Sequence, residues 1–166
     1  MTGQGLRLVG PPEPWFSIKG RSLASIQRLV DAWHRRLGRQ AAGALVWPRS
    51  RQQPLMYEQR QLDSELPPVR WEIVELTSSI DLRIEGQALQ HCVASYARWC
   101  VLGLSRIWSL RRVTGSSQVV PVATIEVNPR ARAIVQARGL RNRTVSYRAR
   151  ELIALWARRE SLALRC

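Results

Sequence analysis

The segment Leu82–Arg112 most constrains the fold, because it joins a helical pattern to a strand pattern through a glycine. Its first part carries apolar residues at steps of three and four, which place them on one stripe of a helix. Gly103 suits the end of that helix, since glycine adopts a left-handed backbone without strain. Ser105–Arg112 then alternates as a strand does. The apolar stripe consists of Leu89, Cys92, Val93, Tyr96, Trp99 and Cys100.

The charge of the chain indicates a polyanionic partner. The 166 residues carry 26 basic and 12 acidic side chains, a formal net charge of +14. Lys19 is the only lysine, so the remaining 25 basic residues are arginine, whose planar fork suits phosphate. Nucleic acid is the first expected partner, and an acidic protein or a membrane surface comes second. No apolar run reaches the roughly 18 residues that a membrane span needs.

Three cysteines, Cys92, Cys100 and Cys166, show no spacing typical of a metal site. The first two are too far apart for a disulfide within a straight helix. We therefore expect reduced thiols, a cytoplasmic location and neither metal nor cofactor.

The chain divides by composition near residue 68. Residues 1–20 are rich in proline and glycine and predict an extended arm, and Leu23–Leu37 predicts a helix that Ser22 caps. Residues 48–68 are polar and contain prolines. They predict a linker or an exposed loop, with a short helix around 57–66 as the alternative. We thus expect an N-terminal arm, helix and linker over 1–68 and an α+β domain over 69–166.

The second domain is predicted to contain a small sheet and helices. Strand patterns cover Val69–Leu76, Ser105–Arg112, Val119–Val127 and Ala131–Arg138. The links after the second and third of these are short, and short links join antiparallel neighbours. The expected fold class is therefore α+β, with a three-stranded antiparallel meander packed against helices. A final helix is expected from Ser146 or Tyr147 to about Leu162.

Period-two alternation sorts the meander into an apolar face, expected to take the helices, and a more polar face. Ile107 and Ile134 also fall on the polar face by this count. One interpretation is the solvated side of an antiparallel sheet with cross-strand ion pairs. The other is a surface for an anion, since hydroxyls, an amide and arginines suit phosphate. The polar residues are Ser109, Arg111, Thr124, Glu126, Gln136 and Arg138.

Polar residues around this sheet complete the candidate site. The run from Arg138 through Gly139 to Asn142 and Arg143 predicts a cradle of backbone and side-chain donors for phosphate. His91 is the histidine nearest in sequence to the sheet, although a lone histidine is more often structural. The simplest interpretation of Tyr96 is a half-buried residue of the predicted helix.

Four separate motifs resemble the PcfJ-like family, whose members occur on conjugative plasmids, phages and other mobile elements. They cover Ile84–Tyr96, Gly103–Arg111, Ala123–Val127 and Gln136–Arg143, within a likeness over roughly residues 70–160. The resemblance implies a mobile-element role and no assigned reaction. Its polar signature falls on His91, Tyr96, Ser109, Arg111, Thr124, Glu126, Gln136, Arg138, Asn142 and Arg143.

Three hypotheses follow for the function. In the first, the chain binds RNA or single-stranded DNA, and Ser109, Thr124, Gln136, Arg138, Gly139, Asn142 and Arg143 contact the phosphate backbone. In the second, it is a metal-independent nuclease or phosphotransfer enzyme with His91, Tyr96, Arg111 and Glu126 as catalytic candidates. In the third, it docks an acidic protein. The first two require the imidazole and the polar sheet face to meet.

Overall fold

The computed structural model describes residues 20–22, 25, 28–29, 44–60, 68–114 and 118–166. The chain forms two compact units, Met1–Ala42 and Gly43–Cys166. In the first unit, Ser25, Arg28 and Leu29 are helical, and the backbone N–H of Ser25 donates to the Ser22 hydroxyl at 3.2 Å. This bond is the cap predicted for the first helix. Most of the predicted helix, and the arm before it, lie outside the described residues.

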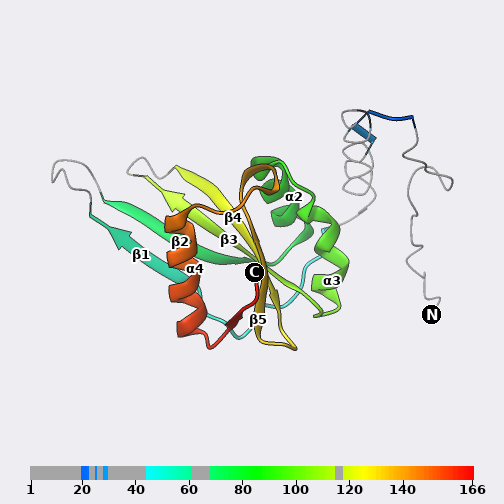
Figure 1. Cartoon of the computed structure of the whole chain (residues 1–166). Helices are drawn as coiled ribbons and strands as arrows, with labels where there is room; N and C mark the ends of the chain where they lie inside the picture. Colours follow the sequence, from blue (N-terminus) through cyan, green and yellow to red (C-terminus); the bar gives the residue numbers. More distant parts are fainter. Residues whose placement is uncertain (1–19, 23–24, 26–27, 30–43, 61–67, 115–117) are drawn as a thin grey trace. The chain divides into compact units, whose positions relative to one another are not determined.

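The second unit is built on a six-stranded sheet in the order β1-β2-β3-β4-β5-β6 (Figure 1). Neighbouring strands are antiparallel except β5 and β6, which are parallel, so the sheet is mixed. The strands are β1 (Leu55–Gln59), β2 (Val69–Leu76), β3 (Arg106–Val113), β4 (Val119–Asn128), β5 (Ala133–Arg138) and β6 (Ala163–Leu164).

The α+β class is confirmed, and the sheet is larger than predicted. The meander β3-β4-β5 is present, and β2 and β1 extend it on one side while β6 pairs on the other. β1 lies within the stretch that was predicted as a linker or loop. It is an edge strand in which Leu55 is buried and Met56 is exposed, so its sequence shows little apolar alternation. The helix proposed as an alternative is wrong over Tyr57–Gln59, and residues 61–67 lie outside the described part.

The single central helix that the sequence predicted is divided into three short pieces. They are α2 (Ser79–Leu89), the 3₁₀ turn η1 (Val93–Tyr96) and α3 (Ala97–Val101). α2 begins at Ser78, whose hydroxyl accepts from the N–H of Asp81 at 3.0 Å. It ends at Gln90, which has a left-handed backbone with φ of 54°. The chain then turns back, because the N–H of His91 donates to the carbonyl of Gly86 at 3.0 Å.

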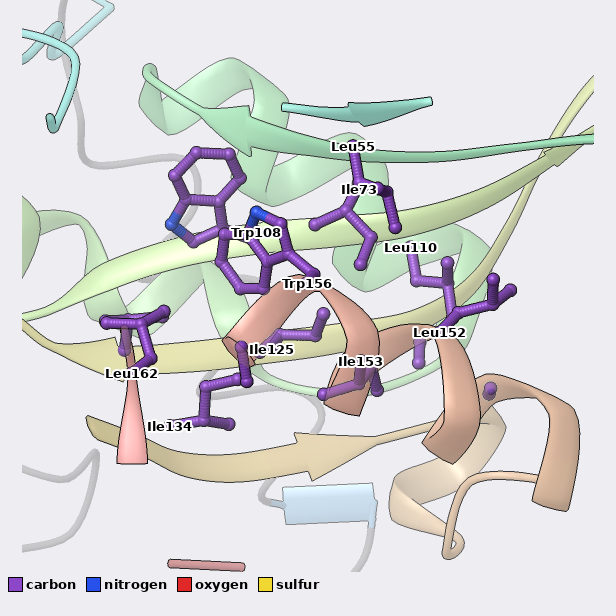
Figure 2. Close-up of a cluster of buried hydrophobic side chains, with 14 residues drawn as sticks. Leu55, Ile73, Trp108, Leu110, Ile125, Ile134, Leu152, Ile153, Trp156 and Leu162 are labelled. Carbon is purple, nitrogen blue, oxygen red and sulfur yellow. The ribbon is translucent and has the colours of Figure 1, made fainter. Parts of the chain in front are cut away.

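The larger hydrophobic core lies between one face of the sheet and α4 (Tyr147–Arg159), as Figure 2 shows. Trp108 of β3 and Trp156 of α4 are fully buried, with ring centroids 4.7 Å apart and planes tilted by 53°. Ile125 and Val127 of β4 belong to the same core. α4 was predicted at this place, and Ser146 caps it by accepting from the N–H of Ala149 at 3.2 Å.

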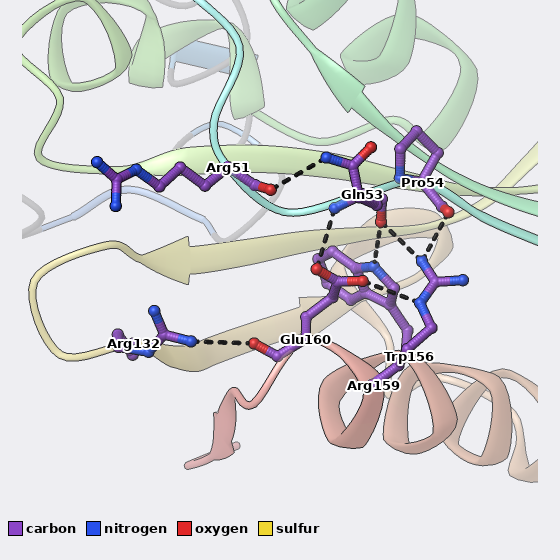
Figure 3. A network of polar contacts seen from close by, with 7 residues as sticks. All are labelled: Arg51, Gln53, Pro54, Arg132, Trp156, Arg159 and Glu160. Carbon is purple, nitrogen blue, oxygen red and sulfur yellow. Dashed lines mark hydrogen bonds and ion pairs between the residues drawn. The ribbon is translucent and has the colours of Figure 1, made fainter.

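Polar contacts join the end of α4 to the segment before β1 (Figure 3). The indole N–H of Trp156 donates to the carbonyl of Gln53 at 2.9 Å. The guanidinium of Arg159 donates to the carbonyls of Gln53 at 2.9 Å and Pro54 at 2.6 Å. A carboxylate oxygen of Glu160 accepts from the N–H of Gln53 at 3.0 Å. Residues more than one hundred positions apart are thereby held together, and β1 is fixed at its start.

The opposite face of the sheet is also covered by an apolar layer, whereas alternation assigned the helices to the apolar face. A second core packs Ile107 of β3 and Leu76 of β2 against Leu82, Val93 and Cys100. The position of Ile134 was also predicted wrongly. A bulge in β5 pairs Glu126 with Gln136 but Val127 with Ile134, so Ile134 joins the larger core. The polar residues of this face therefore lie beside a layer formed by α2, η1 and α3.

Candidate functional site

The turn after α2 directs His91 toward the sheet. A Cβ on Gly86 would lie 2.8 Å from the carbonyl oxygen of His91, closer than side-chain carbons normally approach. Glycine at this position is therefore what lets the chain fold back so tightly. His91 then reaches across to β4, where its Nε2 lies 2.9 Å from Oγ1 of Thr124.

A buried carboxylate lies beneath this contact. Glu85 of α2 is only 2% exposed, and its two carboxylate oxygens accept hydrogen bonds from two neighbouring strands. Ser109 of β3 donates to one oxygen at 2.8 Å, and Thr124 of β4 donates to the other at 2.9 Å. Ser109 and Thr124 face each other in the sheet register. Nε of Arg111 donates to the Ser109 hydroxyl at 3.2 Å.

These contacts form a continuous polar chain, which we define as His91, Thr124, Glu85, Ser109 and Arg111. The sequence predicted that the imidazole and the polar sheet residues meet, and four of these five residues belong to the predicted site. The structure brings them together beside α2. Ser109 and Thr124 are buried and their hydroxyls donate to Glu85. We therefore assign these two hydroxyls to the interior of the fold rather than to phosphate.

The hydrogen-bond directions fix where the protons lie in the polar chain. Thr124 gives its hydroxyl proton to Glu85, so it accepts from His91, and the neutral imidazole carries its proton on Nε2. Burial lowers the pKa of His91, opposed by a hydrogen bond to its own backbone. Burial raises the pKa of Glu85, opposed by the hydroxyls of Ser109 and Thr124 and by the charge of Arg111. Nε2 of the imidazole is thus engaged within the chain.

Tyr96 and Glu126 form a second polar pair further along β4. The hydroxyl of Ser105 donates to Oε1 of Glu126 at 3.0 Å. Burial and then the neighbouring charge and hydrogen bond of Glu126 raise the pKa of Tyr96 to about 12. Tyr96 is half-buried, as the sequence indicated. Glu126 opposes Ile107 in the register, and Ile125 separates it from Thr124 along the strand, so this pair is distinct from the polar chain.

The remaining predicted residues lie on β5 and in the loop that follows. Arg138 pairs with Thr124 in the register, and Gln136 pairs with Glu126. Beyond them, we define the arginine loop as residues 138–143, which include the 3₁₀ turn η2 (Leu140–Asn142). The N–H of Gly139 donates to the carbonyl of Arg143 at 2.9 Å, inside the loop. This N–H, one of the backbone donors of the predicted cradle, is therefore already engaged inside the loop.

The arginine loop has a strained backbone and is attached to the end of α2. Arg141 and Asn142 both have left-handed backbones, with φ of 54° and 59°. This backbone costs a residue such as arginine about 1 kcal/mol or more, whereas asparagine adopts it more readily, and strain of this kind often marks functional sites. Nε of Arg141 donates to Oε1 of Gln90 at 2.6 Å, next to His91 (Figure 1, where the orange loop runs beside α2). Arg141, Asn142 and Arg143 are exposed.

Basic residues dominate this part of the surface. Between residues 138 and 150 the sequence contains arginine at five positions and neither aspartate nor glutamate. Arg148 is the one whose guanidinium lies over an aromatic ring, 4.9 Å from the centroid of Tyr57. The five are Arg138, Arg141, Arg143, Arg148 and Arg150.

Sequence reasoning missed Glu85, although the sequence held a signal for it. Leu82, Glu85 and Leu89 recur at steps of three and four and are the buried residues of α2. A carboxylate inside an apolar stripe needs hydrogen-bond partners when buried. Gln90 was also not assigned to the site, because its contact with Arg141 depends on how two loops meet.

Comparison with known protein families shows the family to which the chain belongs. A family model described as PcfJ-like protein matches residues 27–153. The chain belongs to the PcfJ-like protein family. The match begins well before residue 68, so the family relationship extends further toward the N-terminus than the resemblance in the sequence indicated. No curated protein matches the chain, and no solved structure matches it.

The PcfJ-like match includes every residue of the polar chain and of the arginine loop. Among the described residues, no three His, Cys, Asp or Glu side chains gather as a metal site would require. Within the same ranges, no helix has the length and apolar character to span a membrane. The chemistry visible in the site is thus hydrogen bonding and positive charge.

Proposed function

We propose that this PcfJ-like chain binds the sugar-phosphate backbone of nucleic acid through the arginine loop. The observation that carries the proposal is a strained, exposed loop in which Arg141, Asn142 and Arg143 follow one another with no acidic residue nearby in the sequence. Guanidinium groups donate paired hydrogen bonds to phosphate oxygens. Arg138, which follows Gln136 on the last antiparallel strand, extends the same positive surface toward β4.

The polar chain supports this surface without contacting the ligand. Glu85 and His91 hold the end of α2 against β3 and β4. Gln90 lies at that end, and its side chain accepts from Arg141. The position of the arginine loop therefore depends on the buried carboxylate through α2, and we assign Glu85 and His91 as positioning residues.

The net charge of +14 extends the attraction beyond the loop. A protein that neutralises phosphates releases condensed counterions, and its affinity then falls steeply with salt. The family suggests a role in a mobile genetic element such as a plasmid or phage. The three free cysteines suit the reducing cytoplasm.

The test compares two double variants that lose the same charge. Arg141→Gln/Arg143→Gln removes the exposed loop charges, and Arg158→Gln/Arg165→Gln removes two exposed arginines near the other end of α4. We expect the first to weaken binding of single-stranded RNA by about tenfold or more at fixed salt, since two phosphate contacts are lost. The second should bind nearly as the unchanged protein does.

Equal affinities for all three proteins would contradict the loop assignment. Binding of polyglutamate but not of RNA or DNA would instead support docking of an acidic protein. Folding of each variant is checked by circular dichroism.

A second candidate function is a metal-independent phosphodiesterase, and the polar chain favours it by placing an imidazole, hydroxyls, a carboxylate and Arg111 together. It takes second place because Nε2 of His91 is hydrogen-bonded to Thr124, and the carboxylate and hydroxyls of the polar chain are buried. Labelled RNA and DNA are incubated in EDTA with the unchanged protein, His91→Ala and Arg111→Ala. Cleavage that persists in EDTA and is lost in both variants would favour the enzyme over simple binding.

A further inference from the structure

An exposed aromatic ring stands at the end of the basic segment. Tyr147 is the first residue of α4 and is 72% exposed, the highest value among the large hydrophobic side chains in the described part of the chain. A single exposed apolar residue is ordinary and needs no explanation. Tyr147 differs because only three residues separate it from the arginine loop and because arginines stand on both sides of it in the sequence.

The backbone of Tyr147 lies close to that of Arg143 along the chain. Arg143 and Ser146 have extended backbones, with φ of −66° and −62° and ψ of 157° and 162°. Four extended residues span at most about 14 Å, so Tyr147 and Arg143 are separated by no more than that distance. Leu140, at the other side of the loop, is also exposed. The segment thus combines arginine side chains with exposed apolar side chains.

We infer that Tyr147 is a stacking platform for an unpaired base, which makes single-stranded nucleic acid the preferred ligand of this surface. The inference rests on the proposed function, because the arginine loop must hold the phosphates beside the ring. In a duplex, each base is already stacked on its neighbours and its face is not open to a side chain. In a single strand, the faces are free, and aromatic stacking combined with a basic groove is the usual mode of recognition.

The chemistry of the ring sets the specificity. Every base has a face that can stack, so Tyr147 is expected to select single strands with little preference for sequence. The phenol hydroxyl contributes little to stacking, so phenylalanine and tryptophan should replace tyrosine without loss. Alanine should not, because it removes the surface while leaving all five neighbouring arginines.

The experiment separates base stacking from phosphate contact. Tyr147→Ala, Tyr147→Phe and the unchanged full-length chain are titrated with an oligodeoxythymidine about 16 nucleotides long, a length that spans a typical site. An abasic oligonucleotide of equal length and a duplex are titrated in parallel. We expect Tyr147→Ala to lose about tenfold in affinity for oligodeoxythymidine and nothing for the abasic strand or the duplex. Tyr147→Phe should behave as the unchanged protein.

Two outcomes would overturn the inference while leaving the proposed function intact. In one, Tyr147→Ala binds oligodeoxythymidine as well as the unchanged protein does, while Arg141→Gln/Arg143→Gln binds weakly. In the other, Tyr147→Ala loses the same factor on all three ligands, which would indicate a structural effect. If neither the loop variant nor the tyrosine variant alters binding, both the inference and the proposed function fail. Tyr147→Phe keeps the test valid if alanine disturbs the start of α4.

Discussion

At the scale of single residues, Glu85 has the largest consequences. Its carboxylate is buried beneath the sheet residues it binds, and replacing it with alanine would leave two buried hydroxyls without their acceptor. An unsatisfied buried polar group costs about 1–3 kcal/mol, so we expect Glu85→Ala to lose about 3 kcal/mol or more of stability. Urea unfolding at neutral pH measures this loss. An exposed neighbour, Gln87→Ala, serves as the control.

The charge of Glu85 gives stability a particular dependence on pH. Burial raises its pKa above the ordinary 4.5, so the folded state binds this proton more readily than the unfolded state does. The stabilisation that Glu85 contributes to the folded state is fully present below pH 4.5, and it is lost as the pH rises through the folded-state pKa. Glu85→Gln removes the titration. We therefore expect the stability of the unchanged protein, relative to Glu85→Gln, to increase as pH falls from neutral toward 4.5.

The other titrating groups contribute equally to the pH dependence of stability in the unchanged protein and in Glu85→Gln. His91, linked to Glu85 through Thr124, has a pKa below 6.5, and Glu75 has a pKa raised by burial. Both are present in the unchanged protein and in Glu85→Gln, so the difference between their unfolding curves isolates Glu85. Arg111 is the charged group that faces Glu85 from β3, and it is present in both proteins. If the difference in the free energy of unfolding between the unchanged protein and Glu85→Gln stays constant from neutral pH to pH 4.5, the Glu85 carboxylate does not titrate as its burial requires.

Gly86 tests the turn that positions His91. Alanine at this position would bring its Cβ to 2.8 Å from the carbonyl oxygen of His91, so the turn after α2 must shift. Such overpacking costs about 1–3 kcal/mol, of which improved helix propensity returns about 1 kcal/mol. We expect Gly86→Ala to be less stable than the unchanged protein and to disturb the imidazole resonances of His91. If Gly86→Ala matches the stability of Gln87→Ala, the close approach has no energetic importance.

At the scale of secondary-structure elements, the packing of α4 on the sheet depends on Trp156. This side chain is fully buried against Trp108, and its indole N–H donates to Gln53. We expect Trp156→Ala to cost about 3–5 kcal/mol, the usual range for removing a buried aromatic residue. Trp99 on α3 is 53% exposed, so Trp99→Ala is a control of matched type with a change within about 0.5 kcal/mol. Similar losses for both would contradict the assigned core.

Strands with clear alternation were predicted well, and elements shaped by distant contacts were not. β2 was located at its observed bounds because Val69, Trp71 and Ile73 alternate with the charged residues Arg70 and Glu72. β1 was missed because an edge strand with one buried leucine shows little pattern. The break after α2 was missed because Leu89, Val93 and Cys100 are buried on both sides of it, so the apolar stripe persists although the helix does not. The turn is defined by the close approach of the His91 backbone to Gly86, which the apolar pattern does not reveal.

The site was predicted in part for the same reason. Alternation placed Ser109, Arg111 and Thr124 on one face, and the structure confirms that they lie there with His91. It did not show that α2 covers that face. Glu85 escaped notice because a carboxylate on a helix normally faces solvent, and its burial depends on two hydroxyls from strands further along the chain. The periodicity of the sequence predicts which residues share a face of a helix or strand. The hydrogen-bond partners of a buried charge depend on the tertiary fold.

At the scale of the whole molecule, the two compact units predict where the chain can be divided. Gly43–Cys166 contains the complete sheet and both cores. We expect a fragment of residues 43–166 to unfold in one cooperative transition with a midpoint close to that of the full chain. A fragment of residues 69–166 lacks β1, Gln53 and Trp47, whose indole N–H donates to Leu76 at 3.0 Å. The fragment of residues 69–166 should be several kcal/mol less stable than the fragment of residues 43–166, because side chains that are buried against the missing segment become exposed to solvent.

Equal midpoints for the two fragments would contradict this division and would instead favour a boundary at residue 68. Thermal unfolding followed by circular dichroism is sufficient to distinguish these outcomes, since both fragments retain α4 and the strands from β2 to β6.

The salt dependence of RNA binding tests the central claim most directly, because it counts the phosphates that the protein neutralises. For a single strand, the slope of log Kobs against log salt concentration changes by about 0.7 for each phosphate contact. We predict a steep negative slope for the unchanged protein, and a slope shallower by about 1.4 for Arg141→Gln/Arg143→Gln. Arg158→Gln/Arg165→Gln should retain the original slope. Binding that is insensitive to salt, or equal changes of slope in the two variants, would contradict a phosphate-binding arginine loop.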